Sequence, residues 1–221
     1  MIQDDDEAFN QFPNLQKWYN KLWLAQRLGY NCGPAGTAPD KDGKFVVRPI
    51  MNLSGMGVGA KVIEIKSGDY NSVPSGSFWC EYFNGYHYSV DYELIDDVTV
   101  GPSWKGISSW TGTNYPIDLS KFTEWKRCEY IPKLHNTPKI NWKEIGYGKV
   151  PFINVEFIGD KIIEVHLRKG NTLDYDHMIP VWKSWPDGTT DHFELNGFKY
   201  IENYDDADGQ LEDPRLGFMV K

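Results

Sequence analysis

The chain has 221 residues, of which 40% are hydrophobic and 24% charged, and its formal net charge at pH 7 is −8. This composition is typical of a globular protein that is long enough for one large or two small domains. The negative charge argues against strong generic nucleic-acid binding, and no apolar run approaches the ~18 residues that a membrane span requires.

The cysteines and the N-terminus indicate the compartment. Cys32, Cys80 and Cys128 are far apart and odd in number, and they form no Cys-x-x-Cys motif. This pattern predicts free thiols in a reducing environment. The first seven residues are mostly acidic, the opposite of a secretory or organelle-targeting peptide. We therefore expect a cytoplasmic protein, of a cell or of an infected host.

The first predicted element is a helix over residues 14–30, where apolar residues recur at helical spacing. Asn14 follows a proline and is the expected N-cap, and Gly29 is the expected C-terminal stop. The Gly- and Pro-rich residues 31–44 then read as a loop.

Strands dominate the rest of the chain. Residues 45–50 form a strand candidate that ends at Pro49, and residues 61–65 form another, so the glycine-rich segment 52–60 connects two strands. Residues 119–127 are a further helix candidate. The remaining strand signals lie at 77–83, 86–94, 98–100, 152–158 and 161–167. Together these elements predict an α+β fold made mainly of antiparallel strands.

The last two strand candidates carry the most informative side chains. Alternation along the second strand places Ile162, Glu164 and His166 on one face, and the turn signal Gly159-Asp160 predicts a hairpin that brings Glu156 close to that face. Converging carboxylates repel one another unless a cation lies between them, and Mg²⁺ is the natural occupant. The alternative is an ordinary hairpin with acidic residues on its wet face.

The glycine-rich segment suggests phosphate binding. Gly55, Gly57 and Gly59 have no Cβ, so backbone N–H groups can approach phosphate oxygens closely. Arg48, just before Pro49, supplies a guanidinium beside the loop. The spacing matches neither a P-loop nor a dinucleotide fingerprint. The alternatives are a simple turn for the loop and a surface ion pair for the arginine.

The order of these motifs resembles the ATP-grasp superfamily. The resemblance runs from about residue 20 to 170 and is closest in style to the carbamoyl-phosphate synthetase and biotin-carboxylase branch. The motifs that carry it are a lysine-containing helix at Lys21, the Val-Val-Arg-Pro strand with its glycine loop, Trp79–His87, and Asn154–Arg168.

This resemblance implies two α+β subdomains whose antiparallel sheets sandwich a nucleotide. Residues 1–19 would be an N-terminal segment. Residues 20–95 would form the small subdomain, with the glycine loop and the hinge. Residues 96–221 would form the large subdomain, with the metal site.

The resemblance also implies ATP and Mg²⁺ as cofactors. Arg48 would contact the α- and β-phosphates, and Gly55, Gly57 and Gly59 would cover the β- and γ-phosphates. Lys21 would match the family's first nucleotide lysine. The remaining nucleotide contacts would be the adenine-side hinge Glu81, Tyr82 and Phe83, with His87 at the ribose position.

On the metal side, Glu156 and Glu164 would hold Mg²⁺ together with His166. Arg168 matches the family's arginine after the metal strand and would stabilise charge on the acylphosphate during catalysis.

The chain departs from the family pattern at several positions. His166 replaces the usual asparagine, and an imidazole is a poorer ligand for a hard ion than an amide oxygen. His87 stands where a ribose-binding glutamate is expected, and Cys80 takes the place of the first hinge glutamate. The usual N-terminal substrate domain is not found, so a protein partner would supply the substrate lobe, or the substrate would be carried on a larger molecule.

The implied function is an ATP-dependent ligase that activates a carboxylate as an acylphosphate and joins it to an amine or thiol. Its partners would be small-molecule or carrier-bound carboxylates and amines. The alternatives are a non-catalytic nucleotide-binding or scaffold protein that keeps the fold, and a kinase on the same fold.

Overall fold

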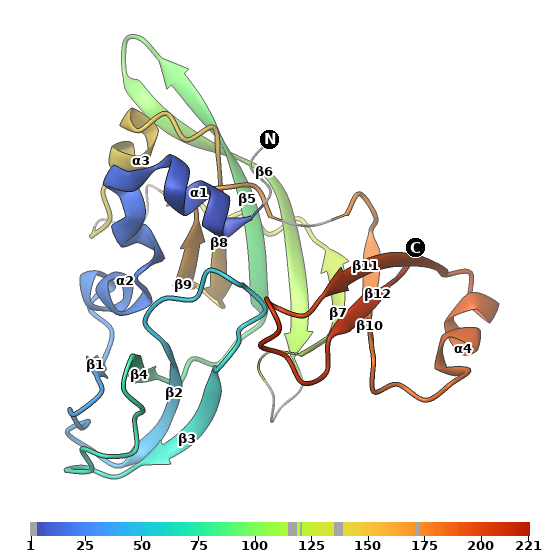
Figure 1. Cartoon of the computed structure of the whole chain (residues 1–221). Coiled ribbons are helices and arrows are strands. Elements are labelled where there is room, and N and C mark those ends of the chain that lie inside the picture. Colours follow the sequence, from blue (N-terminus) through green and yellow to red (C-terminus); the bar gives the residue numbers. More distant parts are fainter. Residues whose placement is uncertain (1–3, 115–118, 120, 135–138, 171–172) are drawn as a thin grey trace.

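The computed structural model describes residues 4–114, 119, 121–134, 139–170 and 173–221. Within them the chain forms one four-stranded and one eight-stranded sheet, both antiparallel, together with short helices (Figure 1). This confirms the predicted α+β class. None of the helices in the described part combines the length and apolarity needed to cross a membrane.

The N-terminal helical region has three segments, which are α1 (Asp5–Gln11), the 3₁₀ helix η1 (Pro13–Tyr19) and α2 (Lys21–Leu28). The single helix predicted over 14–30 is therefore divided, because Asn20 has an extended backbone and begins α2 as its N-cap. Its side-chain oxygen accepts a hydrogen bond of 2.8 Å from the Trp23 amide. The predicted cap Asn14 lies inside η1, whereas Gly29 ends α2 in the left-handed region, as predicted.

The small sheet has the strand order β1-β4-β2-β3. Its strands are β1 (Cys32–Pro34), β2 (Gly43–Pro49), β3 (Lys61–Ile65) and β4 (Ser77–Glu81). Phe45, Val47, Ile65 and Trp79 form its own hydrophobic cluster. The strands predicted at 45–50, 61–65 and 77–83 are confirmed with small shifts at their ends, and the glycine-rich segment connects β2 to β3 as predicted.

The large sheet has the strand order β11-β12-β10-β7-β6-β5-β8-β9. Its strands are β5 (His87–Asp97), β6 (Gly101–Asn114), β7 (Phe122–Arg127), β8 (Phe152–Ile158), β9 (Lys161–His166), β10 (His177–Trp182), β11 (Lys199–Asp205) and β12 (Arg215–Val220). The helices α3 (Lys143–Tyr147) and α4 (Thr189–Leu195) lie in connections between these strands. The predicted subdomain limits 1–19, 20–95 and 96–221 stay a prediction.

The predicted loop over residues 31–44 contains β1 and the start of β2, and two other predicted elements are wrong. The helix predicted over 119–127 is replaced by β7, because pairing with β6 on one side and β10 on the other outweighs the local helical pattern. The strand predicted at 98–100 is a turn between β5 and β6. There the Asp97 carboxylate accepts hydrogen bonds from the amides of Thr99, at 2.7 Å, and Val100, at 3.3 Å, which favours a turn over an extended strand.

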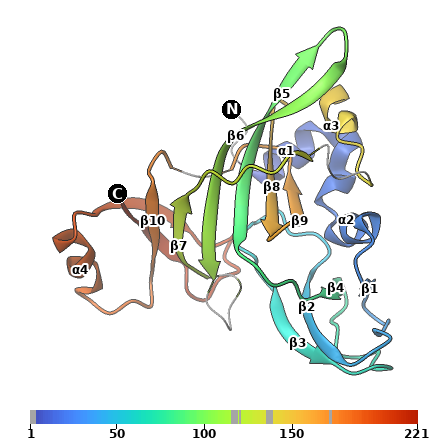
Figure 2. The same cartoon turned by 180° about the vertical axis from the view of Figure 1, so that it is seen from behind.

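The main hydrophobic core lies between the N-terminal helices and the large sheet. Trp18 and Leu24 from the helices pack in one cluster with Val155 of β8 and Val165 of β9. Figures 1 and 2 show α1 and α2 beside the strands β8 and β9, with the small sheet next to these strands. The strands β10 to β12 and the helix α4 lie at the opposite end of the large sheet. The β8–β9 hairpin is therefore held from several directions.

Candidate active site

A cavity of about 1460 Å³ is lined by residues of both sheets. It brings together most of the predicted site residues, which are Arg48, Gly55, Gly57, Glu81, Tyr82, Phe83, His87, Glu156, Glu164, His166 and Arg168. The two other predicted residues, Lys21 and Gly59, are not in its lining. Residues from β2, the β2–β3 loop and β4 therefore share one cavity with residues from β5, β8 and β9.

The predicted hairpin is confirmed, and its register places Glu156 of β8 directly opposite Glu164 of β9. A β-bulge interrupts the pairing between these residues and the turn. The bulge changes the alternation: Ile162 and Val165 are both buried in the core, whereas Ile163 lines the cavity. The prediction that Ile162 shares a face with the glutamate is therefore wrong.

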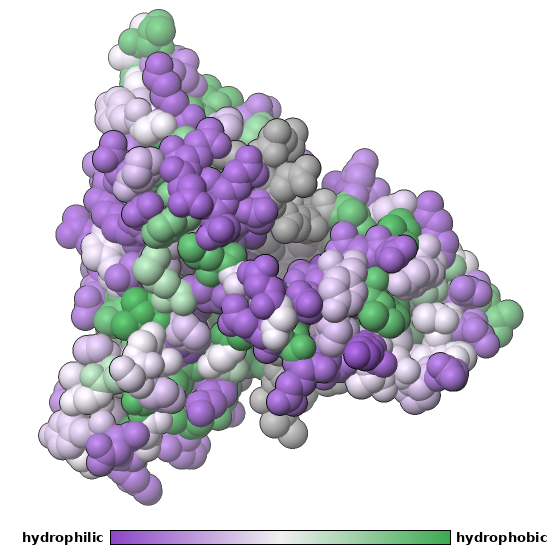
Figure 3. Space-filling view, in the orientation of Figure 1, coloured by the Kyte–Doolittle hydropathy of each residue, from purple (hydrophilic) through white to green (hydrophobic). Residues whose placement is uncertain are grey.

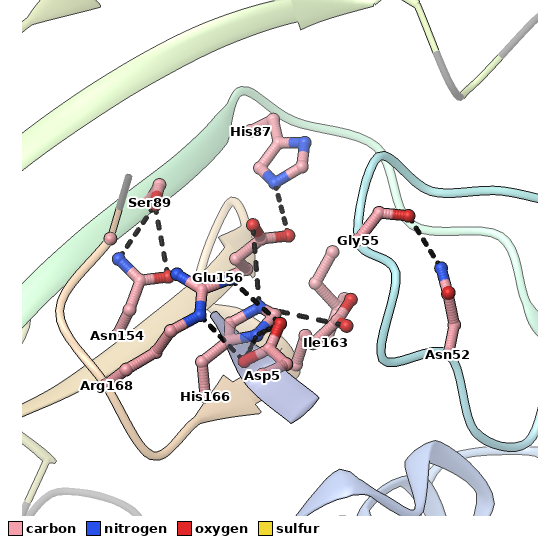
Figure 4. A network of polar contacts seen from close by, with 12 residues as sticks. Asp5, Asn52, Gly55, His87, Ser89, Asn154, Glu156, Ile163, His166 and Arg168 are labelled. Atoms are coloured by element: carbon pink, nitrogen blue, oxygen red, sulfur yellow. Dashed lines mark hydrogen bonds and ion pairs between the residues drawn. The ribbon is translucent and has the colours of Figure 1, made fainter. Parts of the chain in front are cut away.

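Glu156, Glu164 and His166 offer ligand atoms that all lie within 4.8 Å of one another. Figure 4 shows Glu156 and His166 in this polar network. His166 Nε2 is 3.8 Å from Glu156 Oε1 and 3.7 Å from Glu164 Oε1. Two carboxylates and one imidazole form a donor set that fits a divalent cation.

Basic side chains surround the two glutamates. Lys21 Nζ is 2.5 Å from Glu164 Oε1, and its side chain is only 7% exposed. His87 Nε2 is 3.1 Å from Glu156 Oε2. Burial raises the pKa of Glu156, but the neighbouring His87, His166 and Lys21 outweigh this effect and hold the pKa below its usual range. Glu156 is thus placed to act as a carboxylate.

Arg48 connects the small sheet to the hairpin. Its Nη2 donates a 2.8 Å hydrogen bond to the carbonyl of Ile163, the residue displaced by the bulge. Its Nη1 lies 3.9 Å from Glu164 Oε2. The Nε atom is buried and has no hydrogen-bond partner among the described residues. A buried, unpaired donor beside the cavity fits an anionic ligand such as a phosphate oxygen.

Asp5 at the start of α1 is a site residue that the sequence did not reveal. It is only 1% exposed. Its carboxylate accepts from Arg168 Nε at 2.9 Å and from Nη2 at 2.8 Å, and it contacts His166 Nδ1 at 2.9 Å. Burial raises the pKa of Asp5, but His166 and Arg168 lower it well below its usual range. The acidic start of the chain was its only sequence signal.

A buried polar network supports the segment that follows β9. Asn154 Nδ2 donates to Asp91 Oδ1 at 2.8 Å, and the Gly170 amide donates to the same oxygen at 2.7 Å. Ser89 Oγ also bonds the Asn154 side chain (Figure 4). This network ties β5 and β8 to the loop after Arg168 and so stabilises the direction of that arginine.

The glycine loop is held mainly by its own backbone and by the C-terminal strands. Gly55, Met56, Gly57 and Gly59 all have positive φ angles, from 54° to 75°. Backbone in this left-handed conformation can turn successive N–H groups toward one side of the loop, and such a concave group of donors favours binding of an anion. Arg215 Nη1 contacts Met56 Sδ at 3.2 Å, which links the loop to β12.

A second contact joins the loop to the same region, since Gln210 Nε2 donates to Ser54 Oγ at 2.8 Å. Neither Arg215 nor Gln210 was predicted from the sequence, because nothing local indicates a contact across more than 150 positions.

The hinge residues are packed by ordinary structural contacts. The Glu81 side chain accepts a 2.8 Å hydrogen bond from the Asn31 amide. Lys44 Nζ lies 4.5 Å from the centre of the Tyr82 ring. Phe83 packs edge-on against Tyr30, with ring centres 4.8 Å apart. These contacts stabilise the backbone that links the two sheets.

Comparisons with known proteins rest on structure alone. No protein-family model matches the chain, and no curated protein matches it. The structure of N5-carboxyaminoimidazole synthetase from Staphylococcus aureus complexed with ADP is similar, with a TM-score of 0.56 and 11% identity over 94% of this chain and 69% of that one.

Two further structures are more distant. An L-amino acid ligase from Bacillus licheniformis has a TM-score of 0.48 and 11% identity, with 70% of this chain and 41% of that chain covered. A putative ATP-grasp superfamily protein from Archaeoglobus fulgidus has a TM-score of 0.42 and 10% identity, with 99% and 64% covered. The chain thus spans less than two thirds of these two proteins. At such identities the similarity concerns the fold alone.

Proposed function

Starting from the ATP-grasp fold of this chain, we propose that it is an ATP-dependent ligase. It activates a carboxylate as an acylphosphate and joins it to an amine or thiol. One observation carries this proposal: a single cavity joins Arg48, the glycine loop and the hinge to the opposed glutamates and Arg168. Assignment to the carbamoyl-phosphate synthetase and biotin-carboxylase branch stays a prediction.

The charges around the cavity support binding of a metal together with a polyphosphate. At the hairpin, Glu164 pairs with Lys21 and Arg48, and Asp5 pairs with Arg168, but the described residues that line the cavity include ten Asp and Glu residues against four Lys and Arg residues. Because this lining is acidic, it would repel a polyphosphate alone, whereas a divalent cation bound with the polyphosphate would reduce that repulsion. When bound, Mg²⁺ would neutralise phosphate charge during the transfer.

The nucleotide-side residues have distinct proposed roles. Arg48 binds phosphate oxygens through its unpaired Nε, and its other guanidinium nitrogens stay anchored to β9. The glycine loop covers the phosphates with its backbone N–H groups. The hinge backbone reads the adenine edge, and His87 lies near the ribose. Exclusion of water by the loop would protect the acylphosphate from hydrolysis.

Arg168 is the proposed catalytic residue. Its guanidinium has five N–H donors. Asp5 accepts from Nε and Nη2, and the Lys169 carbonyl accepts from Nη1. The remaining N–H groups can donate to an anionic substrate while the pair with Asp5 stays intact. Arg168 would thus stabilise the charge that develops as the acceptor displaces phosphate.

The test is ADP release measured against a panel of carboxylates, with hydroxylamine added to trap an acylphosphate as a hydroxamate. We expect carboxylate-dependent ADP formation and hydroxamate in equal amounts, and loss of both in Glu164→Gln. If no carboxylate stimulates ADP formation although nucleotide binds, the ligase proposal is wrong. Products phosphorylated without an acceptor would instead indicate a kinase.

A second candidate, a non-catalytic nucleotide-binding protein, is favoured by a specific observation. Arg168 and Glu164 are already paired with the buried groups Asp5 and Lys21. If the protein is non-catalytic, it should bind ADP and ATP with similar affinity and show no turnover with any acceptor. A protein partner that contributes to substrate binding remains part of the ligase proposal, and adding cell extract to the ADP assay tests it.

A further inference from the structure

We propose that Asp5 is a positioning residue that fixes His166 as a nitrogen ligand, and that the site therefore selects Mn²⁺ over Mg²⁺. This inference rests on the proposed metal–nucleotide site and assigns it a metal preference. Its basis is the contact between α1 and the end of β9, which brings together residues 161 positions apart.

The contact defines which nitrogen of His166 is available. Both oxygens of Asp5 lie within 3.0 Å of Nδ1. An ionised carboxylate only accepts hydrogen bonds, so Nδ1 must carry the proton and donate it. Nε2 then faces Glu156 and Glu164 at 3.8 and 3.7 Å. With Nδ1 as the donor to Asp5, Nε2 is the nitrogen available to a cation that replaces its proton in the space between the two carboxylates.

The surroundings hold this arrangement in place. Asp5 is 1% and His166 6% exposed. The same carboxylate accepts two hydrogen bonds from the Arg168 fork, and Ala8 anchors α1 in the main core. The imidazole therefore has little freedom to turn away from the glutamates. A carboxylate behind a ligating histidine fixes its orientation and raises its basicity as a ligand.

The donor set determines the expected metal. Mg²⁺ prefers oxygen ligands and near-ideal octahedral geometry. It gives up its bound water reluctantly, so a nitrogen ligand does not readily replace that water. Mn²⁺ accepts carboxylate oxygens as readily and, as a transition-metal ion, accepts an imidazole nitrogen better than Mg²⁺ does. With one nitrogen held toward two carboxylates, the site favours Mn²⁺, and the preference depends on both Asp5 and His166.

The experiment measures ADP affinity by calorimetry in the presence of either Mn²⁺ or Mg²⁺, for the wild type and three variants. We expect the wild type to bind ADP at least about tenfold more tightly with Mn²⁺. His166→Asn should bring the ratio close to one, because an amide oxygen replaces the nitrogen. Asp5→Asn should lose roughly 10- to 100-fold in affinity with Mn²⁺ and less with Mg²⁺.

Asp96→Asn is the control, since Asp96 is an exposed aspartate on β5 that does not line the cavity. It should leave the ratio unchanged. A second measurement records electron spin-echo modulation of Mn²⁺, with and without ADP. Coupling to a ¹⁴N nucleus that disappears in His166→Asn would show the imidazole in the coordination shell. Circular dichroism confirms that each variant is folded.

The outcomes separate the two proposals. Equal ADP affinity with both metals, without nitrogen coupling, overturns the metal preference and leaves the nucleotide site standing. If Mn²⁺ without ADP shows nitrogen coupling but the protein binds no ADP, the role of Asp5 and His166 is supported and the proposed function is wrong. If the folded wild type binds neither ADP nor Mn²⁺, both proposals are wrong.

Discussion

The two walls of the cavity differ in how their polar groups are held. The hairpin wall, made of Glu156, Glu164, His166 and Arg168 with Asp5 behind them, is built from buried ion pairs. The loop wall, made of residues 52–60 and the hinge 81–83, is built from left-handed turns and a few side-chain contacts. The difference suggests that the hairpin wall is preorganised for chemistry, whereas the loop wall adapts to the nucleotide.

The largest expected effect comes from breaking the hairpin wall. Asp5→Ala leaves the buried Arg168 and His166 without their carboxylate, which should destabilise the protein by about 3–5 kcal/mol. Urea denaturation followed by tryptophan fluorescence measures this change. Asp6→Ala, on the exposed side of the same helix, should change stability by less than about 0.5 kcal/mol. Similar values for the two variants would mean that the hairpin wall does not depend on its ion pairs.

The next effect concerns Arg48, which joins the two walls. Arg48→Met keeps most of the side-chain length but removes the hydrogen bond to the Ile163 carbonyl, so stability should fall by about 1.5–3 kcal/mol. ADP affinity should fall as well, by at least about tenfold, because the unpaired Nε donor is lost.

Arg27→Met provides the comparison, because Arg27 is exposed on α2 and does not line the cavity. Neither stability nor ADP affinity should change in that variant. An Arg48 variant that loses stability but keeps its ADP affinity would assign Arg48 a purely structural role.

A smaller stability effect is expected in the loop wall. Gly55 has φ +71° and nothing within 4 Å of a built Cβ, so Gly55→Ala should cost only the left-handed strain of about 1–2 kcal/mol. Gly36 has φ +80° and equally open surroundings, but it does not line the cavity. Both variants should lose similar stability in urea, and only Gly55→Ala should bind ADP more weakly. Equal ADP binding by the two would exclude the loop from the nucleotide site.

Local patterns predicted the parts of the site that depend on neighbouring residues. The turn signal Gly159-Asp160 and the flanking strands were enough to predict that Glu156 meets Glu164. The bulge at Ile163 carries no Gly or Pro signal. It depends on core packing of Val165 and on a hydrogen bond from Arg48, which is 115 positions away.

Other features could not be predicted from the sequence, because they depend on tertiary contacts between distant residues. The segment predicted as a helix at 119–127 pairs instead as β7, where the tilted rings of Phe122 and Trp125 pack with centres 4.3 Å apart. Asp5 belongs to a run of acidic residues, and only the packing of α1 singles it out from its neighbours. The sequence thus predicts which residue types meet, whereas long-range packing decides which of them become buried partners.

The smallest expected effect tests whether the hairpin wall relies on an ionised carboxylate. Burial raises the pKa of Asp5, but His166 and Arg168 outweigh it, so the folded-state pKa lies below that of the unfolded chain. A group of this kind stabilises the protein fully above its unfolded pKa of about 3.9, and its contribution decreases as the pH falls below that value. Between pH 7 and pH 4 the loss from Asp5 should be only about 0.3 kcal/mol, and it should grow at lower pH. Because Asp5→Asn lacks this proton equilibrium, the stability difference between wild type and variant should narrow as the pH decreases. A difference in urea stability that stays constant from pH 7 to pH 3 would show that Asp5 is not held as a carboxylate between His166 and Arg168.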